Sequence, residues 1–291
     1  MPHDPGAVRP GRRAARSDRI AAGRPALDAA RVVQACSAAA PGRRDYPAAV
    51  PKPFLLLQVR PEADARAGEL ASMRRASGLG DRLVARSADL EVLPADLADG
   101  SAAVLVGGSP YSVSDPVGSK GEPQRLAERQ LAALAERALE RELPVFFTCY
   151  GIGVLTLVLG GAVDRTHPEP VSATESRLTE AGRADPAAQV LPERFTALTG
   201  HKESAPEPPP GAVLLATNEV SPVQLYRVGS VLASQFHPEP TTAEFVERAT
   251  IYQRHGYFPQ AELTVVTDRL RAATVTEPQR LLRRFVELAD R

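Results

Sequence analysis

Cys149 stands where a short apolar run meets a glycine-rich segment. Residues 145–148 are apolar and β-prone, and the apolar positions of residues 150–159 recur at helical spacing. A strand that turns directly into a helix forms a nucleophile elbow, which lifts the side chain off the sheet. The helix N-terminus favours a thiolate through its dipole, and Gly151 is small enough for such a turn. The alternative is a buried structural cysteine, the commoner role of a single Cys.

A second chemically active pair follows another apolar run. Residues 231–236 predict a strand, and His237, Pro238 and Glu239 come directly after it. Side chains i and i+2 of an extended strand point the same way, so His237 and Glu239 can act together. A thiolate, an imidazole that takes and returns a proton, and an acid that orients the imidazole make up a cysteine-hydrolase mechanism. The alternatives are an ordinary strand-end histidine and a helix N-terminal acid.

The elements around Cys149 alternate between strand and helix patterns. Strands are predicted at residues 54–59, 82–85, 102–106 and 145–148, and helices at 62–77 and 122–142. This alternation is typical of an α/β fold with an open, mostly parallel mixed sheet flanked by helices. Sites in such sheets lie at the carboxyl ends of the strands, where both Gly108 and Cys149 fall.

The second half of the chain is richer in strand patterns. Strands are predicted at residues 171–178, 195–198, 213–216, 223–228 and 231–236, and helices at 242–253, 260–273 and 278–290. Gly229 is the expected turn of a hairpin, and residues 182–192 read as a polar excursion.

Composition excludes several classes of protein. The 291 residues carry a formal net charge of zero, which gives no signal for nucleic-acid binding. No run of 18 apolar residues exists, so we expect no membrane association. Two cysteines, Cys36 and Cys149, cannot build a disulfide framework, which favours a reducing, cytoplasmic location.

Residues 1–50 differ from the rest in composition. They hold nine Arg and four Asp with no Lys or Glu, and no sustained apolar period. We expect a disordered Arg- and Ala-rich extension that is dispensable for folding, with an organellar transit peptide as the alternative. Residues 51–291 are expected to form a single domain with a C-terminal helical extension.

Five motifs together carry a family resemblance: Val-Leu-Val-Gly-Gly-Ser-Pro (104–110), Cys-Tyr-Gly (149–151), Leu-Gly-Gly-Ala-Val (159–163), Gly-His-Lys (200–202) and Gln-Phe-His-Pro-Glu (235–239). Over about residues 53–248 the chain resembles class I (triad) glutamine amidotransferases, and most closely the glutaminase domain of GMP synthase. The resemblance implies that Cys149 attacks the side-chain amide of glutamine and releases ammonia through a thioester. It also implies that His237 acts as general base and acid and that Glu239 orients the His237 imidazole. The N–H groups of Gly108 and Tyr150 would form the oxyanion hole.

The chain departs from the family pattern at positions that border the substrate. Phe147 replaces the first glycine of the nucleophile motif, and Gly153 stands where the family has a substrate-binding glutamine. His201 and Lys202 occupy another substrate-bordering region, and Lys202 is a candidate partner for the substrate carboxylate. One extra residue also separates Gly108 from Pro110.

These features predict a stand-alone amidotransferase-like enzyme that needs no cofactor and no metal. Its substrate is glutamine or a γ-glutamyl compound. Because neither an adenylating loop nor a Walker A sequence is present, any ammonia-accepting synthetase is expected on a separate chain, with the absence of an acceptor as the alternative. The alternatives are a γ-glutamyl peptide or derivative hydrolase and a non-catalytic regulatory subunit that keeps the fold. A metal site formed by Cys149, His201 and His237 is a further alternative, but these residues are not spaced as the ligand pairs of metal sites usually are.

Overall fold

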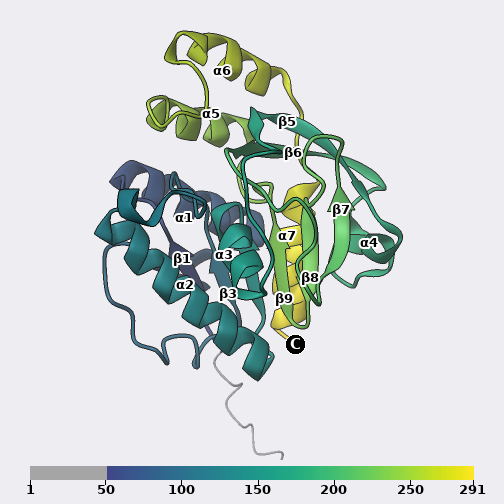
Figure 1. Cartoon of the computed structure of the whole chain (residues 1–291). Coiled ribbons are helices and arrows are strands. Elements are labelled where there is room, and N and C mark those ends of the chain that lie inside the picture. The colour runs from purple at the N-terminus through teal and green to yellow at the C-terminus, as the bar shows by residue number, and fades with distance from the viewer. Residues whose placement is uncertain (1–50) are drawn as a thin grey trace, which may run out of the picture. The chain divides into compact units, whose positions relative to one another are not determined.

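The computed structural model describes residues 51–291, and the predicted extension 1–50, with Cys36, lies outside the described residues. Within the described part, nine strands form one sheet in the order β2-β1-β3-β4-β9-β8-β7-β5-β6 (Figure 1). The strands are β1 Phe54–Gln58, β2 Leu83–Ser87, β3 Val104–Val106, β4 Val145–Thr148, β5 Glu169–Leu178, β6 Arg194–His201, β7 Val213–Thr217, β8 Leu225–Val228 and β9 Val231–Ser234. The α-helices are α1 Ala63–Ser77, α2 Glu122–Arg141, α3 Tyr150–Val158, α4 Glu180–Ala184, α5 Thr242–Ile251, α6 Leu263–Ala272 and α7 Pro278–Ala289.

The sheet has a parallel half and an antiparallel half. Strands β2, β1, β3, β4 and β9 run parallel to one another, whereas β8, β7, β5 and β6 continue the sheet with antiparallel pairings. Strand β1 pairs with β2 on one side and β3 on the other, so the strand order reverses there. The carboxyl ends of the parallel strands meet at one edge, which is where such folds place their sites. The predicted mixed, mostly parallel α/β sheet is confirmed.

Both faces of the inner parallel strands β1, β3, β4 and β9 are buried, whereas the edge strand β2 is partly exposed. Phe54, Leu56 and Phe146 belong to a core that includes the apolar faces of α1 and α7. The alternate residues Leu55 and Phe147 belong to a second core with α2 and α3. Because successive side chains of a strand point to opposite faces, a strand between two helical layers must be apolar throughout. This explains the continuous apolar runs in the sequence.

Local sequence signals explain where several elements end. Gly78 ends α1 in the left-handed conformation, with φ of 76°, and its N–H donates to Arg74 O. Gly229, with φ of 54°, makes the predicted turn between β8 and β9. Thr241 and Glu244 form a capping box that starts α5 just after Glu239.

The structure corrects two expectations about element bounds. The polar excursion at 182–192 is partly helical: Thr179 caps α4, and a 3₁₀ turn covers Ala188–Val190. The last strand ends at Ser234, two residues earlier than the apolar pattern indicates, because Ser234 Oγ and Phe236 O already form a local turn contact at 2.9 Å.

Helices α5 and α6 pack against one end of the sheet (Figure 1). Phe245, Val246 and Leu270 of these helices form a third apolar cluster with Leu198 of β6. This packing brings the C-terminal part of the chain to the residues that follow β9. Among residues 51–291, no helix combines the length and the apolar character needed to cross a lipid bilayer.

Candidate active site

Cys149 lies at the turn between β4 and α3, with no loop residue on either side. Its backbone has φ of 51° and ψ of −100°, an uncommon conformation for a residue with a side chain, and its N–H donates to Ser234 O at 2.8 Å. A Cβ atom at Gly151 would lie 3.0 Å from Phe147 Cδ1 and 3.3 Å from Val106 Cγ1. Glycine therefore lets α3 approach the sheet this closely. The predicted elbow geometry is confirmed.

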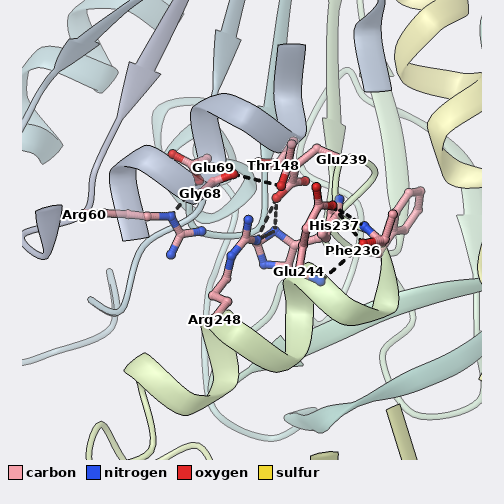
Figure 2. A network of polar contacts seen from close by, with 12 residues as sticks. Arg60, Gly68, Glu69, Thr148, Phe236, His237, Glu239, Glu244 and Arg248 are labelled. Atoms are coloured by element: carbon pink, nitrogen blue, oxygen red, sulfur yellow. Dashed lines mark hydrogen bonds and ion pairs between the residues drawn. The ribbon is translucent and has the colours of Figure 1, made fainter. Parts of the chain in front are cut away.

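His237 and Glu239 follow β9, and their side chains face each other (Figure 2). His237 Nδ1 lies 3.2 Å from Glu239 Oε1, and the carboxylate is fully buried. Two contacts hold the backbone here: His237 N–H donates to Leu198 O at 2.9 Å, and Arg75 Nη2 donates to Glu239 O at 2.8 Å. The imidazole and the carboxylate are thus held as a pair.

The imidazole of His237 lies directly against Gly108, the second residue after β3. A Cβ atom on Gly108 would lie 2.6 Å from His237 Cε1 and 3.4 Å from Nε2, so only glycine fits. Tyr150 is the first residue of α3, and its N–H therefore has no acceptor within the helix. Gly108, Tyr150 and Cys149 thus gather at the carboxyl edge of the parallel strands.

The charges of these groups reinforce one another. Burial alone lowers the pKa of His237, but the charges of Glu239 and Cys149 outweigh it and hold the pKa above its ordinary value. Burial alone raises the pKa of Glu239, but the charges of Arg248 and His237 outweigh it and depress the pKa strongly. The site therefore stabilises a charged imidazole between a carboxylate and the sulfur.

Arg248 of α5 is a member of this network that the sequence analysis missed. Its Nη1 donates to Glu239 Oε1 at 2.7 Å and lies 3.1 Å from His237 Nδ1 (Figure 2). The guanidinium is buried on the same helix face as Phe245 and Ala249. A cation on an otherwise apolar helix face was the signal available in the sequence.

Arg60, two residues beyond β1, is a second cation that was missed. Its Nε lies 2.7 Å from Glu69 Oε1 of α1, and both side chains are almost fully buried. Its Nη1 donates to the hydroxyl of Tyr252 at 3.3 Å, and Gln58 Nε2 donates to the other oxygen of Glu69 at 3.1 Å. The ion pair fixes the guanidinium at the carboxyl edge of the sheet, beside Gly108.

Two small cavities flank Cys149. We name them by one residue each: the His237-side cavity, of about 30 Å³, and the Gly153-side cavity, of about 20 Å³. The first is lined by Arg60, Val171, Gly200, His237, Phe245, Arg248, Ala249, Tyr252 and Phe258. The second is lined by Tyr111, Ser112, Tyr150, Gly153, Val163, His201, Lys202, Glu203, Ser204 and Gln235. Cys149, Ser109 and Tyr257 line both.

Comparison with known proteins identifies the family. The family model "Glutamine amidotransferase class-I" matches residues 77–259, which is more than half of the chain. This chain belongs to the class I glutamine amidotransferase family.

Individual amidotransferase relatives are distant. The chain is 25% identical over 130 residues to "GMP synthase [glutamine-hydrolyzing]" of Thermosipho africanus, a match that covers 44% of this chain and 25% of the relative. It is 26% identical over 110 residues to one subunit of the "GMP synthase [glutamine-hydrolyzing]" of Methanocaldococcus jannaschii, covering 37% and 57% of the two chains. The chain thus spans about a quarter of the first relative and little more than half of the second.

A solved structure supports the same fold. The crystal structure of a glutamine amidotransferase from Thermotoga maritima matches with a TM-score of 0.59 and 17% identity, covering 82% of this chain and 98% of that one. At this identity the likeness concerns the fold alone.

The three predicted substrate-binding residues, Gly153, His201 and Lys202, all line the Gly153-side cavity. His201 is held by its neighbours: Nε2 lies 2.7 Å from Glu169 Oε2, and Nδ1 lies 2.9 Å from Glu203 O. This histidine is therefore engaged on both ring nitrogens, and it lines the Gly153-side cavity whereas His237 lines the other. A Cβ atom at Gly153 would lie 3.0 Å from Val113 Cγ2, so the helix surface is tightly covered there.

Lys202 is half-buried, and its ammonium contacts backbone carbonyls. Nζ donates to Pro110 O at 3.2 Å and to His255 O at 3.4 Å, and it lies 5.0 Å from the centre of the Tyr257 ring. Burial lowers the pKa of Lys202. The lysine therefore ties the segment after α5 to the loop after β3.

Tyr257 lies beside Cys149. It lies between α5 and α6, its hydroxyl donates to Ser109 O at 3.1 Å, and it lines both cavities beside Cys149. Cys149 is only 7% exposed. Cavities of about 30 and 20 Å³ hold one or two water-sized groups. Tyr257 therefore narrows the space on both sides of Cys149.

Proposed function

We propose that this amidotransferase hydrolyses the side-chain amide of glutamine to glutamate and ammonia through a thioester on Cys149. The observation that supports this best is the mutual placement of the three groups: an elbow cysteine, an imidazole whose pKa is raised by the charges beside it, and a fully buried carboxylate behind that imidazole. An elbow sulfur beside an imidazole that can take and return a proton is the arrangement that nucleophilic catalysis by cysteine needs.

The reaction follows from this arrangement. Cys149 Sγ attacks the γ-carbonyl carbon, and the negative oxygen that forms is placed to accept hydrogen bonds from the N–H groups of Gly108 and Tyr150. His237 gives its proton to the leaving nitrogen, the C–N bond breaks and ammonia departs. A water molecule then gives a proton to His237 and adds to the thioester, and C–S cleavage releases glutamate. Glu239 accepts a hydrogen bond from His237 Nδ1 throughout and so orients the ring.

The ammonia-accepting synthetase is proposed to lie on a separate chain. The Methanocaldococcus relative is itself named as a subunit, which supports this arrangement. The principal alternative is hydrolysis of a γ-glutamyl peptide or derivative, supported by a second cavity on the far side of Cys149 from Gly153. A regulatory subunit without activity is the remaining alternative.

One assay tests the proposal directly. Purified protein is incubated with glutamine and, separately, with γ-glutamyl peptides, and glutamate and ammonia are measured. Glutamine should release both products in equal amounts, and Cys149→Ala should release neither while keeping the circular-dichroism spectrum of the wild type. Turnover that survives in Cys149→Ala would refute the nucleophile, and inertness of the wild type toward every substrate would favour a regulatory role without activity.

A further inference from the structure

A buried carboxylate holds the segment that follows β3. Glu203 lies two residues beyond the end of β6, and its side chain is buried. Its Oε1 accepts a hydrogen bond from Val113 N–H at 2.6 Å, and its Oε2 accepts one from Ser114 N–H at 2.8 Å. Hydrogen bonds to an ionised acceptor are roughly twice as strong as those between neutral groups. The carboxylate therefore fixes two successive peptide groups of the segment that begins at Gly108.

The backbone of Glu203 is itself held in place. Its carbonyl oxygen lies 2.9 Å from His201 Nδ1, and His201 Nε2 lies 2.7 Å from Glu169 Oε2. The Glu169 carboxylate also accepts hydrogen bonds from Asn218 at 2.7 Å and from Gln224 at 2.6 Å. Glu203 thus extends from backbone that is tied to the first residue of β5.

A second group of polar contacts reaches the same segment from α2. Lys120 Nζ donates to Val113 O at 2.8 Å and to Glu128 Oε2 at 2.8 Å. Glu128 Oε1 accepts a hydrogen bond from the hydroxyl of Tyr150 at 3.2 Å. The segment that Glu203 holds is thereby linked to Tyr150, the other residue proposed to bind the oxyanion.

The conformation of this segment depends on such side chains. Residues 107–116 lie between β3 and the 3₁₀ turn Val117–Ser119, and they belong to no helix or strand. Gly108, the proposed oxyanion donor, stands near the start of the segment. A donor stabilises the oxyanion only within about 2.7–3.1 Å of the position that the oxygen takes in the transition state. A shift of the segment by a fraction of that distance therefore weakens catalysis.

We propose that Glu203 is a positioning residue: by holding Val113 and Ser114, it keeps the N–H of Gly108 where the oxyanion forms. This inference rests on the proposed function and adds to it a residue that acts through the segment after β3.

The kinetics of Glu203→Gln test the proposal. The amide keeps the size of the side chain, but one of the two acceptor oxygens becomes a nitrogen that cannot accept an N–H. The kcat for glutamine should fall about tenfold or more, whereas KM should change less than about twofold. The matched control is Asp185→Asn, because Asp185 is another buried carboxylate that accepts two backbone N–H groups, those of Ala187 and Ala188. It lines neither cavity beside Cys149 and should keep the wild-type kcat.

Two reactions of Cys149 separate a positioning role from general damage to the fold. Alkylation by iodoacetamide displaces iodide from a methylene carbon and forms no oxyanion. In acylation by p-nitrophenyl acetate, the sulfur adds to the carbonyl carbon, a tetrahedral oxyanion forms, and the C–O bond then breaks to release p-nitrophenolate. Glu203→Gln should slow acylation about tenfold or more and leave alkylation within about twofold of the wild type. Release of p-nitrophenolate by Cys149→Ala is subtracted as background.

The acylation rate does not depend on glutamine being the substrate. Inertness of the wild type toward glutamine, together with selective loss of acylation in Glu203→Gln, would refute the proposed function and leave the positioning role standing. Equal effects on acylation and alkylation, no effect on either, or a wild type that is alkylated but not acylated at Cys149 would overturn the positioning role. If Glu203→Gln does not fold, Lys120→Met, which removes the contact to Val113 O, should show the same selective loss, and its absence would equally overturn the proposal.

Discussion

Arg248 Nη1 lies 2.7 Å from Glu239 Oε1, behind the imidazole of His237. The carboxylate therefore serves two partners at once, a permanent cation and a titrating ring. The guanidinium compensates the buried negative charge when His237 is neutral. The charges of Arg248 and His237 thus outweigh burial and keep the pKa of Glu239 low.

Removing this cation should destabilise the protein. Arg248→Leu leaves the Glu239 carboxylate buried without its permanent partner, and loss of one member of a buried pair costs about 3–5 kcal/mol of unfolding free energy. Urea unfolding of the wild type and of Arg248→Leu measures this difference in unfolding free energy. The matched control is Arg271→Leu, whose pairing with Asp268 is exposed and should contribute at most about 1 kcal/mol. Equal effects of the two changes would contradict the assigned role of Arg248.

The charges around His237 predict how stability depends on pH. Its pKa in the folded protein lies above the ordinary value of 6.5, so proton binding favours the folded state. The stabilisation is complete below about pH 6.5 and is lost as the pH rises through the folded pKa. Glu239 acts in the opposite sense because its pKa is lowered from 4.5: its contribution is present above that value and is lost as the pH falls through the folded pKa.

Unfolding of the wild type and of His237→Gln from about pH 5 to about pH 9 measures the histidine contribution. The difference in unfolding free energy should be largest at the acidic end and should shrink toward the alkaline end. A difference that widens with rising pH would mean that His237 is held neutral in the folded protein.

Because Tyr257 lies beside Cys149, we expect Cys149 to be alkylated slowly in the wild type. Tyr257→Ala removes both the ring and its hydrogen bond to Ser109 O, and alkylation of Cys149 by iodoacetamide should accelerate more than about tenfold. Tyr257→Phe loses only the hydrogen bond, so the rate should rise about fivefold. Peptide mapping by mass spectrometry separates Cys149 from Cys36. If the rates of all three proteins agree, the segment 252–259 does not limit access.

The position of Gly153 predicts a coupled pair of substitutions. Gly153→Gln introduces the side chain typical of the family, but its Cβ atom would meet Val113 Cγ2 at 3.0 Å. We expect a loss of stability of about 1–3 kcal/mol from overpacking. Val113→Ala in the same chain should relieve the contact, and only the double variant should show a lower KM for glutamine. An unchanged KM in the double variant would mean that Gly153 does not border the substrate.

Much of the fold and part of the candidate site followed from the sequence. The apolar runs at β1, β3 and β4, and the helical spacing after Cys149, are local consequences of backbone periodicity, which neighbouring residues determine. His237 and Glu239 are also neighbours in sequence, although the chain bends at Pro238 and Glu239 and does not form the extended strand that the sequence predicted. These features depend on contacts over a few residues and are therefore readable from the order of residue types.

The tertiary structure alone decided which distant groups meet at Cys149. Arg60 follows the first strand and Arg248 lies on α5, and they meet because Phe245 and Val246 dock α5 against Leu198 at the end of the sheet. Tyr257 lies in a segment without periodicity, so no local pattern indicated that it lies beside Cys149 and bonds to Ser109 O. Pairing of buried charges and closure by a loop depend on packing between elements far apart in the chain, and a linear pattern does not encode that geometry directly.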